Sequence, residues 1–299
     1  MKPSVALPPT IVLCTACNET YALGGTVALT SALRHLPAGG APVRVYVLDG
    51  GMRPRTWARL ARSLVTTGRK HDLVRLKPEM GRFAGLPQDW GSSVMTYARL
   101  ALPELVDEQR LIYLDADMVV QADLTPLAHL HLGDAMVAAA PDVVTRTLGN
   151  EGLPVRELGL PPDDPYLQAG FLIIDLPRWR REKVSERVLA YLHAWPKHAR
   201  YWDQSALNVV LHRRWLALSA NWNMPAWWAD EGRGGCHLDG ELLHFVGPHK
   251  PWLLGHDQGG SAGRFFAEVR RTAWGNWRPN RLRQALKYAK YRLSQLFRR

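Results

Sequence analysis

The sequence predicts an α/β protein with a three-layer α/β/α arrangement, in which helices cover both faces of a parallel sheet. Apolar strand-like runs alternate with amphipathic helical patterns along the first third of the chain, an order that favours this class. The run at 111–114 is apolar on both faces, as expected of a strand buried in such a sheet. Asp115 and Asp117 follow at its carboxyl end, where open α/β sheets bind ligands.

The first half of the chain supplies most of the expected sheet. Pro54 suits the first turn of a helix, because its fixed φ and missing N–H cost nothing there. The residues that follow it place Trp57, Leu60 and Leu64 on one helical face. We expect strands at 11–17, 43–48, 73–76 and 111–114, and helices from Gly24 to Leu36, from Pro54, and from Met95 to Leu105.

The pattern is looser after Asp117. Residues 145–165 are rich in Gly, Pro and Asp, which predicts a functional loop or lid. Asp203 is suited to the N-cap of a helix. The tryptophans at 222, 227 and 228 form either an apolar sugar platform or part of the core. We expect further strands at 135–140, 168–175 and 242–247, and helices from Arg180 to Trp195 and from Asp203.

The composition limits the classes of protein to which this chain can belong. The 299 residues are 46% hydrophobic and 22% charged, as in an ordinary globular protein with a sizeable core. The apolar runs fall short of the ~20 residues that a membrane-spanning helix needs, and residues 1–4 lack the apolar segment of a signal peptide. We therefore expect a cytoplasmic protein. Cys14 and Cys17 fall on opposite faces of the first strand, which favours buried reduced thiols over a redox or metal pair.

The net charge of +11 is concentrated at the carboxyl end. Eight basic residues and no acidic residue lie from Arg278 onward. Apolar residues recur there at intervals of three and four, as in a basic amphipathic helix on an anionic membrane surface. We expect a main domain over 1–275 and this helix over 276–299. A helix that docks on its own domain, or a disordered tail, is the alternative.

Asp115 and Asp117 are two residues apart, so they point the same way on an extended backbone. Two carboxylates held together in a semi-buried place repel each other, and a divalent cation removes that conflict. Oxygen ligands suit Mg or Mn, particularly where substrate phosphates complete the coordination shell. The alternative is that one Asp caps a helix and the other is solvated.

Five short motifs carry a resemblance to a known family. They are Tyr97-Ala98-Arg99-Leu100, Leu114-Asp115-Ala116-Asp117, Gln168-Ala169-Gly170-Phe171, Asp203-Gln204 with Asn208, and His244-Phe245-Val246-Gly247 through Lys250-Pro251-Trp252. In order and approximate spacing they resemble family 8 glycosyltransferases over residues 11–255, and most of all the bacterial lipooligosaccharide galactosyltransferases and glucosyltransferases. The resemblance implies a GT-A fold, the Rossmann-like fold of nucleotide-diphospho-sugar transferases, for the 1–275 domain, which would then be catalytic.

The resemblance also implies a site for a UDP-sugar donor. The metal ligands would be Asp115, Asp117 and His244, holding Mn or Mg against the two phosphates, with Ala116 between them in the donor site. Gly247 would let the backbone approach the phosphate oxygens. Lys250 would place a positive charge on the leaving group. The alternatives are a core or surface histidine and a solvated lysine.

Other donor-site residues follow from the same resemblance, with two departures from the family pattern. Arg99 would lie near the donor sugar and pyrophosphate, unless it is a solvated helix residue. Tyr21 would stack on uracil. Asn18 stands where the family usually has an acid, although its oxygen can still accept from the uracil N3–H and Glu19 could substitute in part. Gln168 stands where the family commonly has Asn, so its reach to a donor or acceptor sugar differs.

The catalytic residues implied by the resemblance are Arg99, Asp203 and Gln204. Asp203 would bind donor hydroxyls. Gln204 lies where a nucleophile is expected, but a neutral amide is a poor nucleophile. We therefore favour front-face displacement, in which the departing phosphate helps to deprotonate the acceptor hydroxyl. Asp142 and Gln168 would contact the acceptor.

The expected function is metal-dependent retaining transfer of a hexose, galactose or glucose, from a UDP-sugar to a glycan acceptor such as a lipopolysaccharide or lipooligosaccharide precursor. Such acceptors lie at the inner membrane, so the tail would make the enzyme peripheral there. A glycogenin-like transferase acting on a protein or a soluble glycan is one alternative. A non-catalytic nucleic-acid or membrane-binding module is the other, motivated by the pI of about 9.9. For the enzyme, no nucleic-acid partner is expected.

Overall fold

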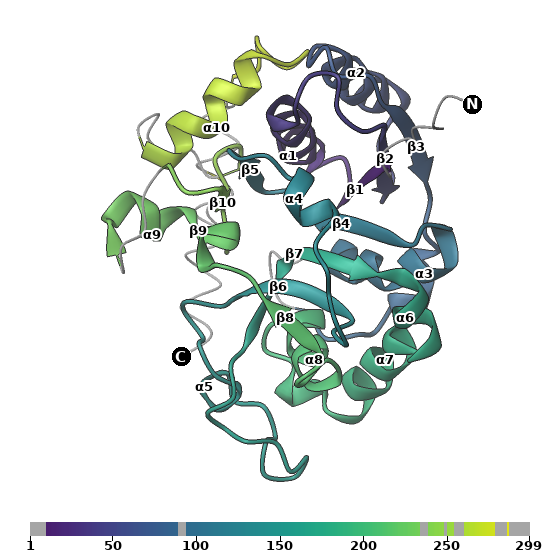
Figure 1. Ribbon diagram of the computed structural model, residues 1–299, viewed down its shortest axis with the longest axis vertical. Coiled ribbons are helices and arrows are strands. Elements are labelled where there is room, and N and C mark those ends of the chain that lie inside the picture. Colours follow the sequence, from purple (N-terminus) through teal and green to yellow (C-terminus); the bar gives the residue numbers. More distant parts are fainter. Residues whose placement is uncertain are drawn as a thin grey trace, which may run out of the picture.

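The structure is a computed structural model (Figure 1). It describes residues 10–88, 94–233, 239–247, 250–253, 260–278 and Leu286. Two sheets organise the fold. The large sheet has seven strands in the order β3-β2-β1-β4-β7-β6-β8, and the small sheet has the order β5-β10-β9. The large sheet comprises β1 (Ile11–Cys17), β2 (Val43–Asp49), β3 (Asp72–Leu76), β4 (Arg110–Leu114), β6 (Val137–Pro141), β7 (Leu167–Asp175) and β8 (Trp215–Ala217). The small sheet comprises β5 (Met118–Val120), β9 (Met224–Pro225) and β10 (Leu242–His244).

Helices cover both faces of the large sheet, which confirms the predicted three layers (Figure 1). The α-helices are α1 (Ala22–His35), α2 (Pro54–Val65), α3 (Leu102–Leu105), α4 (Thr125–Ala128), α5 (Leu148–Glu151), α6 (Leu176–Arg181), α7 (Val184–Ala194), α8 (Asp203–Val210), α9 (Ala226–Glu231) and α10 (Gly260–Arg270). The 3₁₀ helices are η1 (Met80–Phe83), η2 (Val94–Ala101), η3 (Pro196–His198) and η4 (Ala220–Asn223).

The core lies on both sides of the large sheet. One side packs β-strand residues against Leu29 of α1 and Leu60 of α2, and the other packs them against Trp179 of α6 and Leu207 of α8. Strand β1 contributes to both sides, because successive side chains on a strand point to opposite faces. Cys14 and Cys17 accordingly lie in different core clusters as buried free thiols, as predicted.

The sheet is mixed, and the prediction of a parallel sheet is wrong for β7. Strands β1, β2, β3 and β4 pair in parallel, but β7 lies antiparallel to both β4 and β6. Antiparallel neighbours need no crossover helix, so the long 142–166 connection can enter β7 directly. Because Leu114 pairs with Phe171, the residues after β4 and the first residues of β7 meet at one edge of the sheet.

Three predicted helical features differ in the structure. The helix expected from Met95 to Leu105 is η2 followed by α3, because Pro103 has no N–H to continue an α-helical ladder. The helix expected from Arg180 to Trp195 is interrupted at Lys183, whose φ of 51° is left-handed. Asp203 is the first residue of α8 rather than its N-cap, which is Trp202. The predicted 145–165 loop includes the short helix α5.

Helix α10 lies beside α1 (Figure 1), where Arg34 Nε is 3.0 Å from Glu268 Oε2. Beyond it, the expected tail helix at 276–299 lies outside the described residues apart from 276–278 and Leu286, and it stays a prediction. Across the part of the chain that the structure describes, no helix has both the length and the apolar character needed to cross a bilayer.

Candidate active site

The candidate site lies where the chain passes from the large sheet to the small one. Residues 115–117 connect β4 to β5. The backbone of this link is held on both sides, because Asp115 N donates to Gly170 O over 2.8 Å and Phe245 N donates to Asp117 O over 2.9 Å. The two acidic side chains are therefore fixed at the junction of the sheets, near the carboxyl end of β4.

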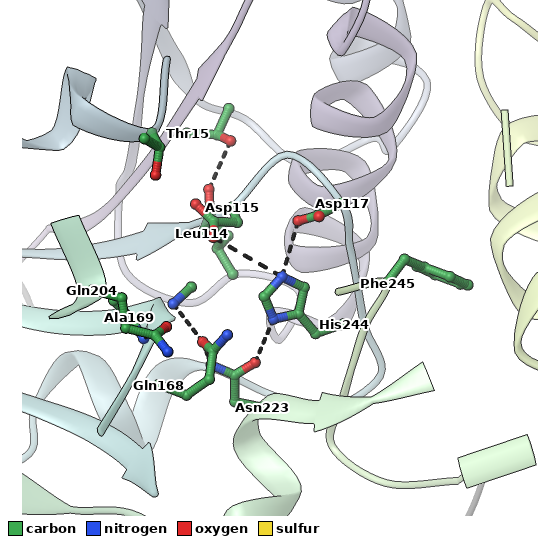
Figure 2. A network of polar contacts seen from close by, with 12 residues as sticks. Thr15, Leu114, Asp115, Asp117, Gln168, Ala169, Gln204, Asn223, His244 and Phe245 are labelled. Atoms are coloured by element: carbon green, nitrogen blue, oxygen red, sulfur yellow. Dashed lines mark hydrogen bonds and ion pairs between the residues drawn. The ribbon is translucent and has the colours of Figure 1, made fainter. Parts of the chain in front are cut away.

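His244 joins the two acids at this junction (Figure 2). It pairs with Met118 of β5 from the neighbouring strand β10. Its Nε2 lies 3.1 Å from Asp117 Oδ1 and 4.0 Å from Asp115 Oδ2. Among the described residues, these three side chains form a group whose ligand atoms all lie within 4.8 Å of one another.

Gly170 makes room for this group. A Cβ at this position would lie 2.5 Å from His244 Cε1 and 2.9 Å from Asp115 Oδ2, closer than side chains tolerate. Gly170 belongs to the Gln168-Ala169-Gly170-Phe171 motif, so part of that motif serves to let β7 approach the acids. The glycine is required here for close approach rather than for an unusual φ.

The fit of these residues to a divalent cation rests on one carboxylate oxygen. Asp117 Oδ1 is buried, and its polar contact among the described residues is His244 Nε2 at 3.1 Å, which satisfies it only while that nitrogen carries a proton. A buried carboxylate oxygen without a partner costs free energy unless a ligand satisfies it. Two carboxylates and an imidazole are suitable ligands for Mg or Mn. The residues present therefore fit the metal that the sequence predicts.

The pKa values of the two acids shift in opposite directions. Lys250 Nζ contacts Asp117 Oδ2 and donates to Phe245 O over 2.5 Å. Burial acts to raise the pKa of Asp117, but Lys250 and then His244 outweigh it and hold that pKa well below its usual range. Burial raises the pKa of Asp115 above its usual value, with Asp117 acting in the same direction and Arg99 against it.

Arg99 is buried at the centre of the site, so the alternative of a solvated helix residue is wrong. Its Nη2 lies 2.9 Å from Asp115 Oδ1 and its Nε lies 2.9 Å from Asp203 Oδ2, while Nη1 donates to Ala169 O. Its guanidinium also lies 4.5 Å from the centroid of the Tyr113 ring. Burial acts to lower the pKa of Arg99, but Asp115 and Asp203 outweigh that effect, and the group stays charged.

Asp203 is buried at the first turn of α8, and its carboxylate contacts Arg99 and Thr96. Thr96 Oγ1 donates to its Oδ1 over 2.5 Å. Burial raises the pKa of Asp203 above its usual value, and Arg99 acts against that rise. The preceding residue, Trp202, has φ 54° and ψ −120°, a strained backbone for a residue with a side chain. Such strain is found where a neighbouring side chain must be held in one place.

Gln204 and Asp142 lie together on the other side of the Gln168-Ala169-Gly170-Phe171 motif. Gln204 Oε1 accepts from Ala169 N over 2.9 Å, and its Nε2 donates to Asp142 Oδ2 over 3.3 Å. Asp142 Oδ1 accepts from two backbone N–H groups of the turn that follows it. Gln168 Oε1 accepts from Gly170 N over 2.6 Å. The structure thus brings the predicted acceptor-side residues beside Gln204.

The residues expected at the base lie at the start of α1. Asn18 Oδ1 accepts from Thr20 N and Tyr21 N, at 3.0 and 3.2 Å, so the side chain shapes this turn. Glu19 binds Arg53 N and Thr56 Oγ1 at the start of α2, so it is engaged in capping that helix. The Tyr21 ring meets Trp252 edge-on at 5.8 Å.

Ala116 and Gly247 complete the predicted donor site. Ala116 O lies against α1, where a Cβ at Gly24 would come within 2.1 Å of it. Gly247 has a φ of 78°, a left-handed conformation that favours glycine. The tryptophans have separate environments, since Trp222 stacks on Phe171 with a centroid distance of 5.9 Å, whereas Trp227 is 39% exposed.

Sequence reasoning missed two residues that contact this site. Thr96 binds Asp203, and Asn223 binds His244 Nδ1 over 2.8 Å. Neither belongs to the quoted motifs or to a recognisable spacing. Although Asn221 lies only two residues before it, the available signal for Asn223 was an amide between two large apolar residues, Trp222 and Met224. Its burial shows why a polar side chain is there: it satisfies another buried polar group.

The α/β sheet, with two acids at the end of β4, has the GT-A type of fold found in nucleotide-sugar transferases. The sequence model of Glycosyl transferase family 8 matches residues 12–254. The chain belongs to this family, and it is a hexosyltransferase.

Relatives and solved structures agree with this assignment. General stress protein A of Bacillus subtilis (strain 168) is 26% identical over 258 residues, which span 81% of this chain and 86% of that protein. Lipopolysaccharide 1,2-glucosyltransferase of Escherichia coli (strain K12) is 30% identical over 157 residues, 48% of this chain and 44% of that protein. The crystal structure of galactosyltransferase LgtC in complex with donor and acceptor sugar analogs superposes with a TM-score of 0.73 at 26% identity, covering 90% of this chain and 98% of that one.

Proposed function

We propose that this protein is a retaining glycosyltransferase that moves galactose or glucose from a UDP-sugar to a glycan acceptor, such as a lipopolysaccharide or lipooligosaccharide precursor, with Mn or Mg as its cofactor. The observation that carries the proposal is the cluster at the end of β4, where the buried Oδ1 of Asp117 faces His244 and the ligand atoms of Asp115, Asp117 and His244 all lie within 4.8 Å of one another. The names of the relatives, a lipopolysaccharide glucosyltransferase and a galactosyltransferase, support the choice of sugar and acceptor class.

Asp115, Asp117 and His244 would hold the metal, which would supply positive charge to the diphosphate of the donor. Lys250 adds a second positive charge beside Asp117, and its pKa is raised because that carboxylate outweighs the effect of burial. Gly247 would allow the backbone to approach phosphate oxygens. These groups are fixed before the reaction, so they can stabilise the negative charge that grows on the leaving group without reorganising.

Transfer with retention would proceed on one face of the sugar. The bond from the anomeric carbon to the phosphate oxygen breaks, the bond to the acceptor oxygen forms on the same face, and the acceptor proton passes to the departing phosphate. Gln204 would steady the developing positive charge on the sugar with its amide oxygen rather than attack it. The bonds from Ala169 N and to Asp142 fix the orientation of that amide. Asp142 and Gln168 would contact the acceptor.

Arg99 would link the donor to this machinery, because it contacts both Asp115 and Asp203. Asp203 would bind hydroxyls of the donor sugar, and Tyr21 and Asn18 would bind the uracil base. The Asn18 oxygen already accepts two backbone N–H groups. Selectivity for uracil would therefore depend on Tyr21 as well as on this amide.

The direct test is a screen of nucleotide sugars with the purified protein and Mn, in which released UDP is measured without an acceptor. We expect hydrolysis of UDP-galactose or UDP-glucose, and its loss when EDTA removes the metal. Added Mn should restore the rate after EDTA treatment. Activity that is undiminished in chelator would contradict the metal assignment, and inactivity with every nucleotide sugar would contradict the proposed reaction.

The 276–299 segment is proposed to bind an anionic membrane surface through a basic helix that begins after Arg278, because residues 276–278 are not helical, and so to make the enzyme peripheral on the inner membrane. A protein that ends at residue 277 lacks eight basic residues. We expect it to lose cosedimentation with phosphatidylglycerol vesicles and to keep UDP-sugar hydrolysis in solution. Vesicles of neutral phosphatidylcholine are the control, since electrostatic binding requires anionic lipid. Equal cosedimentation of both proteins would contradict the membrane role, and loss of hydrolysis would favour a non-catalytic binding module.

A further inference from the structure

A chain of hydrogen bonds runs from the backbone of β7 to His244 (Figure 2). The direction from donor to acceptor is fixed at its first bond. Gly170 N lies 2.6 Å from the side-chain amide of Gln168. A backbone N–H can only donate, so the amide atom that faces it must be the oxygen, Oε1. The usual ambiguity in the orientation of a glutamine amide is therefore absent at this residue.

The first bond also fixes which atom of the Asn223 amide is the donor and which is the acceptor. Gln168 Oε1 also lies 2.5 Å from one atom of the Asn223 amide, and this atom must be the donor, Nδ2. The oxygen of that amide, Oδ1, consequently faces His244 Nδ1 at 2.8 Å. An acceptor in this position requires the proton of the neutral imidazole to be on Nδ1, and the lone pair is left on Nε2.

We propose that Asn223 is a positioning residue that holds His244 in the tautomer needed for metal binding. The proposal rests on the proposed function, because it assigns His244 as a ligand. Asn223 and His244 are both 2% exposed, so water does not replace the bond between them. Metal binding requires the neutral ring, in which the lone pair on Nε2 faces Asp117 Oδ1 at 3.1 Å, and a cation between or beside these two acceptors would relieve their contact.

The chain of bonds also orients Gln168. Its Oε1 accepts two hydrogen bonds, from Gly170 and Asn223, whereas its Nε2 makes no hydrogen bond to the residues that the structure describes. Gln168 therefore presents a donor toward a sugar hydroxyl, while its acceptor is committed to Asn223. Metal ligation and sugar recognition thus depend on the orientation of one asparagine.

The first test is Mn affinity, measured by electron paramagnetic resonance of the free ion, without donor or turnover. We expect Asn223→Ala to weaken Mn binding by roughly 10- to 100-fold, the usual effect of losing a group that orients a metal-binding histidine. Asn223→Asp keeps an acceptor opposite Nδ1 but loses the donor to Gln168 Oε1, so it should bind Mn less tightly than wild type and more tightly than Asn223→Ala. The exposed Asn221 lies on the same 3₁₀ helix, so Asn221→Ala is a matched control that should bind as wild type does.

The second test reads the tautomer itself, in protein with ¹⁵N-labelled histidine and no metal, with the His244 signals assigned from the His244→Gln variant. The spectra are recorded at a pH high enough for the ring to be neutral, where we expect wild type to have a protonated Nδ1 and an unprotonated Nε2, and Asn223→Ala to populate the other tautomer. A protonated Nε2 in the neutral wild-type ring, or Asn223→Ala that binds Mn as tightly as wild type, would overturn the proposal. If wild type shows the expected tautomer but binds no Mn, the proposed metal function fails and so does the role of Asn223 in metal binding.

Discussion

Replacement of Asp117 by asparagine is expected to abolish sugar transfer while the protein stays folded. The amide keeps the shape of the carboxylate and still offers Lys250 an acceptor, but it removes the negative charge that would bind the cation. Loss of a charge-stabilising group of this kind reduces kcat by about 10³-fold, which corresponds to about 4 kcal/mol. Alanine should have the same effect on turnover. UDP release and Mn binding should be measured together for both variants.

The surface residue Asp134 offers a matched control, because it is exposed and far less constrained than Asp117. Asp134→Asn should leave turnover and Mn binding unchanged. Circular dichroism and thermal unfolding would show that Asp117→Asn is folded. Wild-type turnover in either Asp117 variant would refute the metal assignment.

Replacement of Arg99 by methionine is expected to destabilise the protein as well as inactivate it. The side chain is 3% exposed and is the shared partner of Asp115 and Asp203. Its removal leaves two buried carboxylates without their counter-charge, and breaking a buried ion pair in this way costs about 3–5 kcal/mol. Asp115 and Asp203 should then be protonated more readily, because Arg99 acts to lower the pKa of each. Urea denaturation gives the free energy of unfolding.

Two further variants separate charge from geometry at this position. Arg99→Lys retains a charge, but an ammonium group lacks the planar fork that contacts both acids, so we expect partial recovery of stability with little recovery of activity. Arg55 is exposed on α2, and Arg55→Met should change the free energy of unfolding by less than about 0.5 kcal/mol. An Arg99→Met protein as stable as wild type would show that the two acids do not need this partner.

The sequence predicts the β1–β4 half of the sheet well because its signals are local. Apolar runs define the strands, and Pro54 marks the start of α2, where the structure has it. The acids after β4 and the distant His244 could be grouped only through the family resemblance, and the structure does bring them together. Local patterns and a set of ordered motifs thus account for the fold class and for most of the candidate site.

Features that depend on distant contacts were not predictable in this way. The antiparallel direction of β7 follows from pairing with β4 and β6, which no local pattern reports. Asp203 has the sequence signature of a helix cap, but it is the first residue of α8, and its carboxylate contacts Arg99 and Thr96, which are distant in the sequence. The role of Asn223 could be recognised only in the structure, where its amide binds both Gln168 and His244.

The link at 115–117 joins β4 of the large sheet to β5 of the small one, and His244 reaches the same point from β10. An ion held by these residues would link the two sheets where residues 115–117 connect them. A ligand that binds the folded arrangement alone adds to its stability in proportion to how fully it is bound. Occupancy by the metal ion and resistance to unfolding are therefore expected to rise and fall together in this protein.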